Sequence, residues 1–319
     1  MKLHRFLRPL LAAPLLGAAV TAQAQLSMML PANPGGGWDS TGRQSMQAMN
    51  EAGIYTGTVS FTNKGGAGGT IGLADFQRSQ KGKADALAVF GAITVGSIAM
   101  NKSPIDLSKF RPVARLTAEY VVLAVKADSP YENLDDFVQA MKANPGAMPV
   151  GGGSAGGTDH IALALLAQQG QVPVKALNYI PQAGGADTVT GIVNGTLKAG
   201  ISGASEFQQF ADSGRIRILA ISSDKRMRGL EQVPTFTEAG YKVEIANWRG
   251  ILGSVDMPEE NYQLWIDHFT QLSEAPQWKA TQERLGWEPY FLAGDKFGDF
   301  IKAETERTTT ILQDAGLIQ

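Results

Sequence analysis

The sequence predicts an α/β protein made of two lobes that are joined by two crossing strands, with a ligand cleft between them. Strand-like and helix-like segments alternate over residues 26–125, and a second alternation of similar length follows over 134–222. Alternation of this kind predicts a parallel sheet covered by helices. Two longer apolar β-like runs, 113–125 and 243–253, follow the two alternations, so each can carry the chain from one lobe to the other.

In the first alternation, the pattern predicts strands at 26–30, 58–62 and 86–90 and helices at 40–52, 70–79 and 93–101. The long run at 113–125 is strongly apolar in its second half, and we expect a break in it near 117–119. No later segment has the length of uncharged apolar sequence that a membrane span needs.

In the second alternation, a helix at 134–143 begins near Ser129-Pro130 and ends at Asn144-Pro145-Gly146. The segments after it are predicted as strand 148–150, helix 160–169, strand 174–180, helix 186–193, strand 197–201, helix 205–212 and strand 216–222. Helices at 259–273, 276–284 and 296–315 follow the return crossing. We therefore expect a first domain from 25–125 plus 248–319 and a second domain from 126–247.

Residues 1–24 have the pattern of a secretory signal peptide. Lys2, Arg5 and Arg8 precede a short apolar stretch, and Ala22-Gln23-Ala24 forms a small-residue cleavage site. We therefore expect export to a bacterial periplasm and cleavage near Ala24. The absence of cysteine is compatible with that compartment, although disulfides are permitted there.

The charge balance argues against nucleic acid as a partner. The chain has 28 Lys and Arg and 30 Asp and Glu, and three of the basic residues lie in the leader, so the remaining chain carries about −5. A mildly acidic surface attracts neither nucleic acid nor anionic lipid. A site for an anion must therefore act locally, against the overall charge.

Four glycine-rich loops each lie between a β-like run and a helix-like run. They are 34–40 (PGGGWDS), 65–70 (GGAGGT), 151–159 (GGGSAGGTD) and 184–187 (GGAD). Glycine lets the backbone approach a ligand closely, and the helix start behind it offers free N–H groups and the positive end of the helix dipole. Each loop is a candidate anion-binding site, although a tight turn alone is the alternative explanation.

Several side chains near these loops are candidates for ligand contact. Trp38 forms either a wall of the cleft or part of the core, and Ser154 and Thr158 offer hydroxyl donors to carboxylate oxygens. Arg249, in the return crossing, is the better candidate for neutralising charge at the cleft. Arg43 lies four residues after Asp39, so an intrahelical ion pair is its simplest role.

Four further residues have simpler explanations than ligand contact. Asp39 or Ser40 is expected to cap the helix, and Lys64 is expected to be a solvated surface residue. His160, at a helix start, is expected to pack and hydrogen-bond near its loop. We also expect that Gly36→Val or Gly68→Val would abolish binding and leave the fold largely intact.

The motifs together resemble the periplasmic substrate-binding proteins of tripartite tricarboxylate transporters, also called Bug-type receptors. The matching segments, in order, are 34–39 with Arg43, 63–69, 153–160, Tyr179 with 184–185, 200–203 and 247–250. The tryptophan after the first glycine run and the segments 156–160 and 248–250 are similar to the citrate-type branch. The sequence departs from the family pattern at Thr62 and at Lys198.

The resemblance implies a type II-like periplasmic binding fold that closes around a small organic di- or tricarboxylate, without a cofactor, a metal or a catalytic residue. It also implies a monomer that delivers the ligand to the large and small inner-membrane subunits of a transporter. The predicted ligand-binding residues are Gly35, Gly36, Gly37, Trp38, Asn63, Gly66, Ala67, Gly68, Ser154, Gly157, Thr158, Gly184, Gly185, Ser202 and Arg249.

Enzyme and signalling functions are the alternatives. The run 151–156 matches a dinucleotide fingerprint, but the strand that follows has no acidic residue to hold a ribose hydroxyl. The run 152–156 matches a hydrolase elbow around Ser154, yet only His160 and His268 of the exported chain could act as a base. The same two histidines give no recognisable metal-ligand set. A receptor for a two-component sensor would use the same cleft and stays open.

Overall fold

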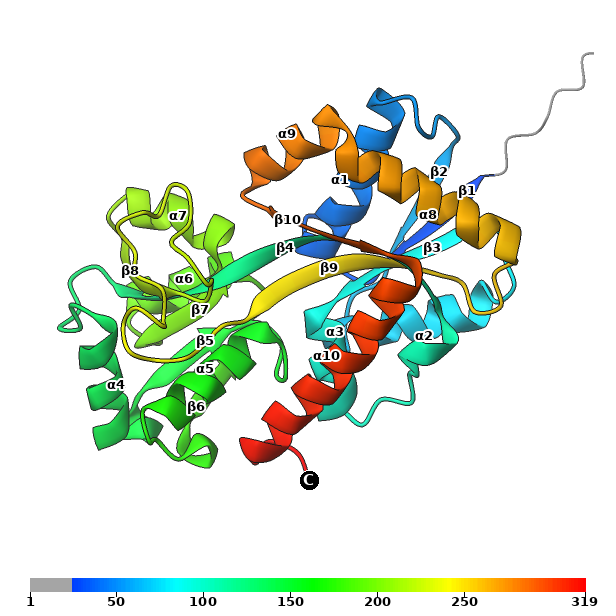
Figure 1. Ribbon diagram of the computed structural model, residues 1–319. Helices are drawn as coiled ribbons and strands as arrows, with labels where there is room; N and C mark the ends of the chain where they lie inside the picture. The colour runs from blue at the N-terminus through cyan, green and yellow to red at the C-terminus, as the bar shows by residue number, and fades with distance from the viewer. Residues whose placement is uncertain (1–24) are drawn as a thin grey trace, which may run out of the picture.

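The computed structural model describes residues 25–319, and its ribbon shows two α/β lobes side by side (Figure 1). The predicted signal peptide, 1–24, lies outside the described residues. None of the described helices is long and apolar enough to cross a membrane. The two-lobed α/β fold that the sequence predicts is therefore confirmed.

The first lobe contains a sheet with strand order β2-β1-β3-β9-β4, and β10 pairs with β4. These strands are β1 (Leu26–Leu30), β2 (Val59–Asn63), β3 (Ala86–Gly91), β4 (Arg111–Lys126), β9 (Ala246–Gly253) and β10 (Glu288–Ala293). The helices of this lobe are α1 (Gly37–Glu51), α2 (Thr70–Ser79), α3 (Ala92–Met100), α8 (Glu259–Glu274), α9 (Pro276–Leu285) and α10 (Gly294–Asp314).

Helices cover both faces of this sheet. One core cluster joins α1, α8 and α9 to the sheet through Met49, Trp265 and Trp278. The other joins α2 and α10 through Phe76 and Phe297. Because each face is buried, the central strand β3 is apolar and buried along its whole length.

The second lobe continues from the far half of β4 through β7 (Ala199–Gly203) and β5 (Pro149–Gly152) to β6 (Asn178–Pro181), and β8 (Ile216–Ile221) also pairs with β4. Its helices are α4 (Leu134–Ala143), α5 (Thr158–Gln169), α6 (Gly185–Asn194) and α7 (Ala204–Asp212). Short 3₁₀ turns lie at Ala67–Gly69, Leu107–Lys109, Pro145–Ala147 and Val174–Ala176.

Local sequence explains where these helices begin and end. The side chain of Asn133 accepts a hydrogen bond from the backbone of Asp136, and the Asp136 carboxylate accepts one from the backbone of Asn133, which is a capping box at the start of α4. Helix α9 starts with Pro276 and ends at Gly286, whose φ of 66° suits glycine.

The strand β4 belongs to both lobes. Residues 111–120 pair with β9 in the first lobe, and 121–126 pair with β7 and β8 in the second. The predicted crossing is confirmed, but the break expected near 117–119 is wrong, because a register shift between Arg115 and Thr117 bends the ladder without ending it.

Three other predictions need correction. The sheet is mixed, since β1, β2 and β3 are parallel to one another but β9 is antiparallel to both of its neighbours, β3 and β4. The segment 174–180 holds a 3₁₀ turn before the short β6. The strand β10 was missed, because its sequence EPYFLA follows directly on a helical pattern.

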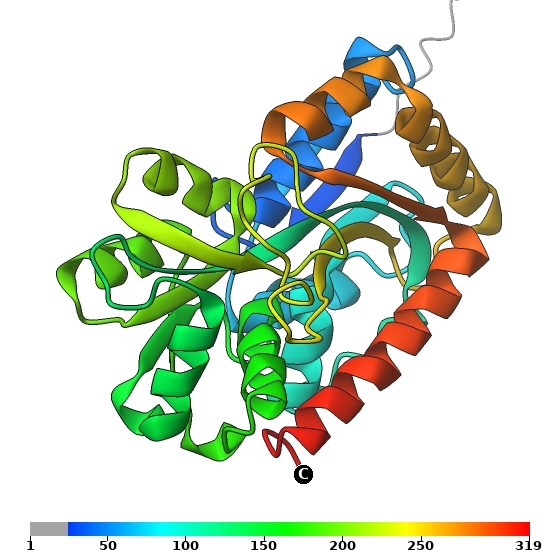
Figure 2. The ribbon, with the colours of Figure 1, turned by 60° about the vertical axis from the view of Figure 1, so that its left-hand side comes forward.

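The helix α10 contacts both lobes. It lies along the first lobe, and its end reaches the second lobe beside α5 (Figures 1 and 2). Leu312 belongs to the core cluster of the second lobe, together with Leu163 and Leu166. The two predicted domains are 25–125 plus 248–319 and 126–247. They are therefore in contact at this helix, as well as connected by the crossing strands.

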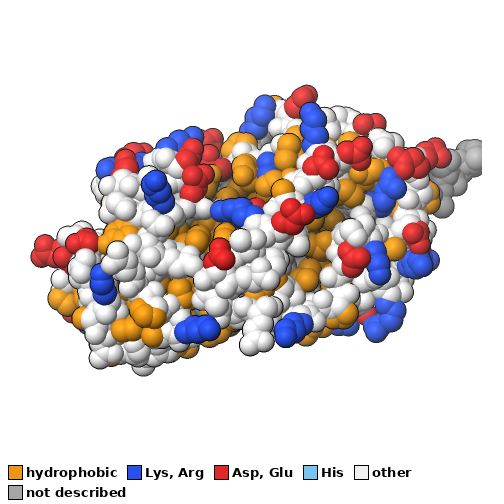
Figure 3. Space-filling model, turned by 60° about the horizontal axis from the view of Figure 1, so that its bottom comes forward, with side chains coloured by type: hydrophobic (Ala, Val, Ile, Leu, Met, Phe, Trp, Pro, Cys, Tyr) orange, Lys and Arg blue, Asp and Glu red, His pale blue; other side chains and the backbone are white. Residues whose placement is uncertain are grey.

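The charged surface matches the bulk composition. On the face shown in Figure 3, Lys and Arg side chains are intermixed with Asp and Glu, without a broad region of one sign. That face offers no basic stripe of the kind that nucleic-acid binding needs.

Candidate functional site

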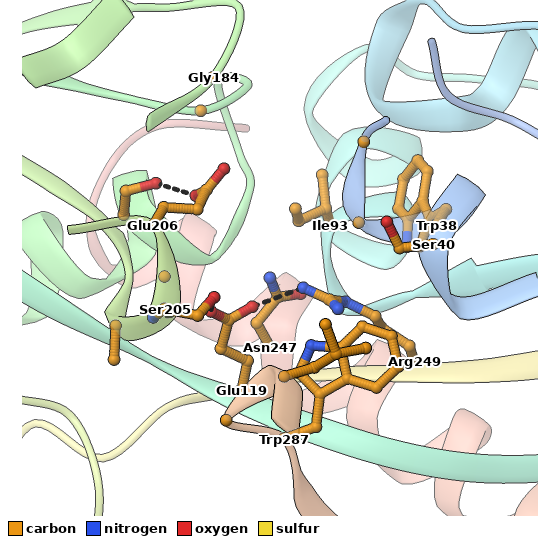
Figure 4. Close-up of a pocket in the computed structure, with 18 of the residues that line it drawn as sticks. Trp38, Ser40, Ile93, Glu119, Gly184, Ser205, Glu206, Asn247, Arg249 and Trp287 are labelled. Carbon is orange, nitrogen blue, oxygen red and sulfur yellow. Dashed lines mark hydrogen bonds and ion pairs between the residues drawn. The ribbon is translucent and has the colours of Figure 1, made fainter. Parts of the chain in front are cut away.

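A cavity of about 1270 Å³ lies between the two lobes. Its walls come from the loops that follow β1, β2 and β3 in the first lobe and β5, β6 and β7 in the second (Figure 4). Loops at the carboxyl ends of strands are where open α/β sheets place their ligands. We therefore take this cavity as the candidate binding site.

Eleven of the predicted binding residues line the cavity: Gly35, Gly36, Gly37, Trp38, Gly66, Ala67, Gly68, Ser154, Gly184, Ser202 and Arg249. Asn63, Gly157, Thr158 and Gly185 are not among the lining residues. The departures from the family pattern, Thr62 and Lys198, also lie outside the lining.

The first lobe presents helix N-termini without side-chain caps. The N-cap residues of α1, α2 and α3 are Gly36, Gly69 and Gly91, and none of them has a side-chain cap hydrogen bond. The first N–H groups of a helix have no partner within the helix, so they are available to an anion. The glycine loops thus place several donors around one space.

The side chain of Arg249 packs against the first of these loops at Gly37. It lies on β9, only 6% exposed, and its guanidinium occupies the space that a side chain at Gly37 would need, 2.9 Å from the position of a Cβ. Nη2 of Arg249 donates to Oε2 of Glu119 at 2.6 Å. The positive charge of Arg249 next to the loop is thus balanced by the buried carboxylate of Glu119 (Figure 4).

Gly68 has a packing role as well as a place on the cavity wall. Its φ is +61°, and a Cβ there would lie 1.8 Å from the Ser97 hydroxyl. The expectation that Gly68→Val would leave the fold intact is therefore wrong. Gly36 has no such contact below 3.2 Å, so a substitution there is tolerated far better.

Trp38 combines both of the roles considered for it. Its side chain is 8% exposed, packs with the core of the first lobe and also lines the cavity. It faces the second lobe across the cavity, beside Ser40 and Ile93 (Figure 4).

A polar network holds the first loop in place. Asp39 accepts hydrogen bonds from the backbone of Gly35 and from the side chains of Arg43 and Asn63. These bonds lower the pKa of Asp39, although burial opposes them and raises it. The ion pair predicted for Arg43 is confirmed. The side-chain amide of Asn63, which was predicted as a ligand contact, donates hydrogen bonds to the carboxylate of Asp39 and to the carbonyl of Ala32.

Lys64 lies on the surface next to the second loop. It forms an ion pair with Asp75, and its side chain is 42% exposed. The expectation of a solvated surface lysine agrees with this position.

The third loop contains a buried carboxylate. Asp159 accepts from the backbone of Gly153 at 2.7 Å and from the hydroxyl of Thr158 at 3.1 Å. Thr158 is 1% exposed, so its hydroxyl serves Asp159 rather than the cavity. Burial, together with the nearby charges of Glu206 and Glu119, raises the pKa of Asp159 to about 7, although the hydrogen bonds from Gly153 and Thr158 lower it.

His160 packs behind the same loop. Its ring stacks on Tyr179 with centroids 4.2 Å apart, and Nδ1 accepts from the backbone of Gly156. Burial lowers its pKa to about 4, so the ring is neutral. The packing role expected for His160 is confirmed, and with Nδ1 committed to Gly156 this histidine is not arranged as a base for Ser154.

Several cavity residues were not found from the sequence. Glu119 lies in the middle of the apolar run of β4, and Glu206 lies in the first turn of α7. Asn247 lies in β9, and Trp287 directly precedes β10. The segment 247–250 gave a signal for Asn247, but nothing in the sequence pairs Glu119 with a residue 130 positions away. Among residues 25–319, no group of three or more His, Asp or Glu could hold a metal ion.

Two α/β lobes around a cavity lined by helix N-termini define a solute-binding protein. The chain belongs to the tripartite tricarboxylate transporter family of receptors, whose family model matches residues 43–317. The resemblance that the motifs indicated is thus confirmed at the level of the family, and the chain is a receptor rather than an enzyme.

Individual relatives agree with this family. The chain is 26% identical over 301 residues to protein BugT of Bordetella pertussis, covering 91% of this chain and 89% of that protein. Among solved structures, it is similar to MatC of Rhodopseudomonas palustris with bound malate, with a TM-score of 0.79, 19% identity and coverage of 91% and 99%. It is also similar to Rpa4515 of R. palustris with adipate, with a TM-score of 0.81, 20% identity and coverage of 93% and 98%.

Proposed function

We propose that this protein is a periplasmic receptor that captures a small organic carboxylate between its lobes and delivers it to a secondary transporter in the inner membrane. The observation that carries the proposal is the convergence of three uncapped helix N-termini, those of α1, α2 and α3, around one cavity. Backbone N–H groups at helix starts bind carboxylate oxygens without a lysine or arginine in direct contact.

The proposal includes the finer points that the sequence favours. These are removal of the leader near Ala24, action as a monomer, and handover to a large and a small membrane subunit. The citrate-like di- or tricarboxylate is one candidate ligand. Malate and adipate, the acids bound by two structural neighbours, are further candidates.

Binding acts by shifting the population of lobe arrangements. A ligand that touches loops of both lobes stabilises a closed form, and the membrane partner distinguishes the closed form from the open one. The connections are suited to this, because β4 runs through both sheets and gives the lobes a common strand.

The test is thermal unfolding of residues 25–319 against a panel of citrate, tricarballylate, succinate, malate, adipate, glutamate and neutral sugars. A ligand at about 100 times its dissociation constant stabilises the folded state by roughly 2.7 kcal/mol. We expect stabilisation by one or two carboxylates and none by sugars. A panel in which no carboxylate shifts the melting temperature would contradict the proposal.

A matched pair of variants links the binding to the cavity. Gly184 lines the cavity with extended backbone and open space around its Cβ position, so Gly184→Leu extends a side chain into that space. Gly146 also has open space but lies outside the lining. We expect Gly184→Leu to weaken binding and Gly146→Leu to bind normally, with both variants folded.

A further inference from the structure

The two lobes contact each other on both sides of the crossing strands. In the view of Figure 1, α3, α5 and α10 lie below β4 and β9, and α7 and α9 lie above them. On the α10 side the contact is close and buried. A Cβ at Gly96 of α3 would lie 1.8 Å from the carbonyl oxygen of Gly156, and Leu312 of α10 packs in the core of the second lobe. Separating the lobes on this side would therefore break close packing and expose apolar surface.

On the other side, the second lobe contributes an irregular segment to the cavity wall. The connection from β8 to β9, residues 222–245, contains no helix or strand. Connections of this length are uncommon in compact domains and often act as lids or binding loops. Residues 224–229, which we call the strap, are mostly exposed, whereas Ser223 before them and Leu230 after them are buried. The strap is therefore a surface loop that is anchored at both ends.

Hydrogen bonds within the second lobe hold the strap in shape. The guanidinium of Arg226 donates to the carboxylate of Glu238 at 2.9 Å and to the carbonyl oxygen of Glu231 at 3.0 Å. The backbone N–H of Gly229 donates to Oε1 of Glu231 at 3.0 Å. The strap thus has a defined conformation on its own lobe, independent of the first lobe.

Arg228 is the residue of the strap that reaches the first lobe, where it forms an ion pair with Glu283 of α9. Of the ion pairs within residues 25–319, this one alone joins the two predicted domains. Both side chains line the cavity, yet they are 81% and 60% exposed, so the pair lies where the cavity opens to solvent. The strap and α9 thus bridge the mouth of the cavity.

The exposure of this pair suits a contact that forms and breaks repeatedly. An exposed ion pair contributes little free energy, because water screens the charges and two long side chains lose freedom when they meet. The pair of Arg249 and Glu119 also lines the cavity, but it is buried, so breaking it is costly. Of these two pairs, Arg228 and Glu283 can therefore separate at small cost each time a ligand enters or leaves.

We propose that the strap is a latch over the cavity mouth, and that the ion pair of Arg228 with Glu283 forms when the lobes close and breaks when they open. The α10 side stays packed while the strap side parts. The latch acts on the closed form without contacting the ligand, so it sets how long the ligand stays bound. This inference rests on the proposed function, because it needs a ligand held between the lobes.

The test measures ligand dissociation by stopped-flow tryptophan fluorescence with malate, adipate and citrate, since Trp38 and Trp287 line the cavity. We expect Arg228→Gln and Glu283→Gln each to raise the dissociation rate by about two- to fivefold, the range that an exposed ion pair allows. The association rate and the urea midpoint should stay unchanged, because the latch closes after the ligand enters and adds little to the stability of the fold.

A charge exchange separates the latch from a direct ligand contact. Arg228→Glu alone should raise the dissociation rate more than Arg228→Gln, because it places two carboxylates together at the mouth. The double variant Arg228→Glu with Glu283→Arg should return the rate close to that of the parent chain. Lys126→Gln is the control: it removes the same charge from the second lobe outside the cavity lining, where Lys126 pairs with Asp128 of its own lobe. It should not change the rate.

The outcomes separate this inference from the proposed function. If a carboxylate binds and neither Gln variant changes its dissociation rate, the latch is wrong and the carboxylate receptor stands. If the charge exchange leaves dissociation as fast as in Arg228→Glu alone, Arg228 acts on the ligand directly and the latch is also wrong. If none of the three carboxylates binds the parent chain and the thermal panel shows no carboxylate that does, the proposed function itself fails.

Discussion

Removing the charge of Glu119 is expected to destabilise the protein strongly, because the Arg249 guanidinium would stay buried without a partner. The two side chains are 4% and 7% exposed, and their charged atoms are 2.6 Å apart. Breaking a buried pair by removing one member costs about 3–5 kcal/mol. Glu119→Gln should therefore lower the free energy of unfolding by that amount.

A double-mutant cycle separates the pair from its surroundings. Arg249→Met keeps much of the side-chain volume, and the double variant Glu119→Gln with Arg249→Met has no buried charge left. We expect the double variant to lose much less than the two single losses together, with a coupling of about 2 kcal/mol or more. Urea unfolding followed by tryptophan fluorescence at neutral pH measures each corner of the cycle.

The pair of Arg228 and Glu283 is the matched control. It also lines the cavity, but its side chains are 81% and 60% exposed, so solvent screens the interaction. We expect no measurable shift of its urea midpoint in the same cycle. A loss below about 1 kcal/mol for Glu119→Gln, or additive losses for the two single variants, would refute the buried-pair reasoning.

Three further outcomes follow from the site. Gly37→Ala should displace the Arg249 guanidinium and weaken carboxylate binding by about tenfold or more, whereas Gly146→Ala should not; calorimetry that finds equal affinities would exclude this contact. His160 is held neutral with a pKa near 4, so its titration should lower stability by roughly 3 kcal/mol as the pH drops from 6.5 to 4; Asp159→Asn removes the opposing titration of Asp159, and a melting temperature of that variant that is independent of pH over this range would contradict the prediction. Asp159 has a pKa near 7, raised above its unfolded value of about 3.9, so stability is lost as the pH rises from about 4 to 7, and Asp159→Asn should melt higher than the parent chain at pH 8.

The sequence predicted the helices and most strands because their signals are local. Helix α2 and helix α4 were placed to the residue, since a glycine loop precedes one and a cap and an Asn-Pro-Gly stop enclose the other. The strand β10 was missed because its stability comes from pairing with β4, more than a hundred residues earlier. Non-local pairing leaves no mark on the six residues themselves.

The glycine loops were identified correctly as cavity walls, but their glycines serve packing as well. Gly37 leaves room for Arg249, Gly68 for Ser97, and Gly69 for Trp38. A run of glycines in a sequence cannot separate close approach to a ligand from close approach to another side chain, because both require the same missing Cβ. The structure decides between them position by position.

A receptor with a net negative charge can still collect an anion, because the two effects act over different distances. Salt screens the repulsion from surface charges that lie more than a Debye length from the ligand, about 8 Å at physiological ionic strength. The N–H groups of the loops act at hydrogen-bond distance inside the cavity, where screening is weak. The affinity of the proposed receptor should therefore vary little with salt, whereas a site built from surface lysines would lose affinity steeply. The buried position of Arg249 behind Gly37, already balanced by Glu119, fits the first arrangement and not the second.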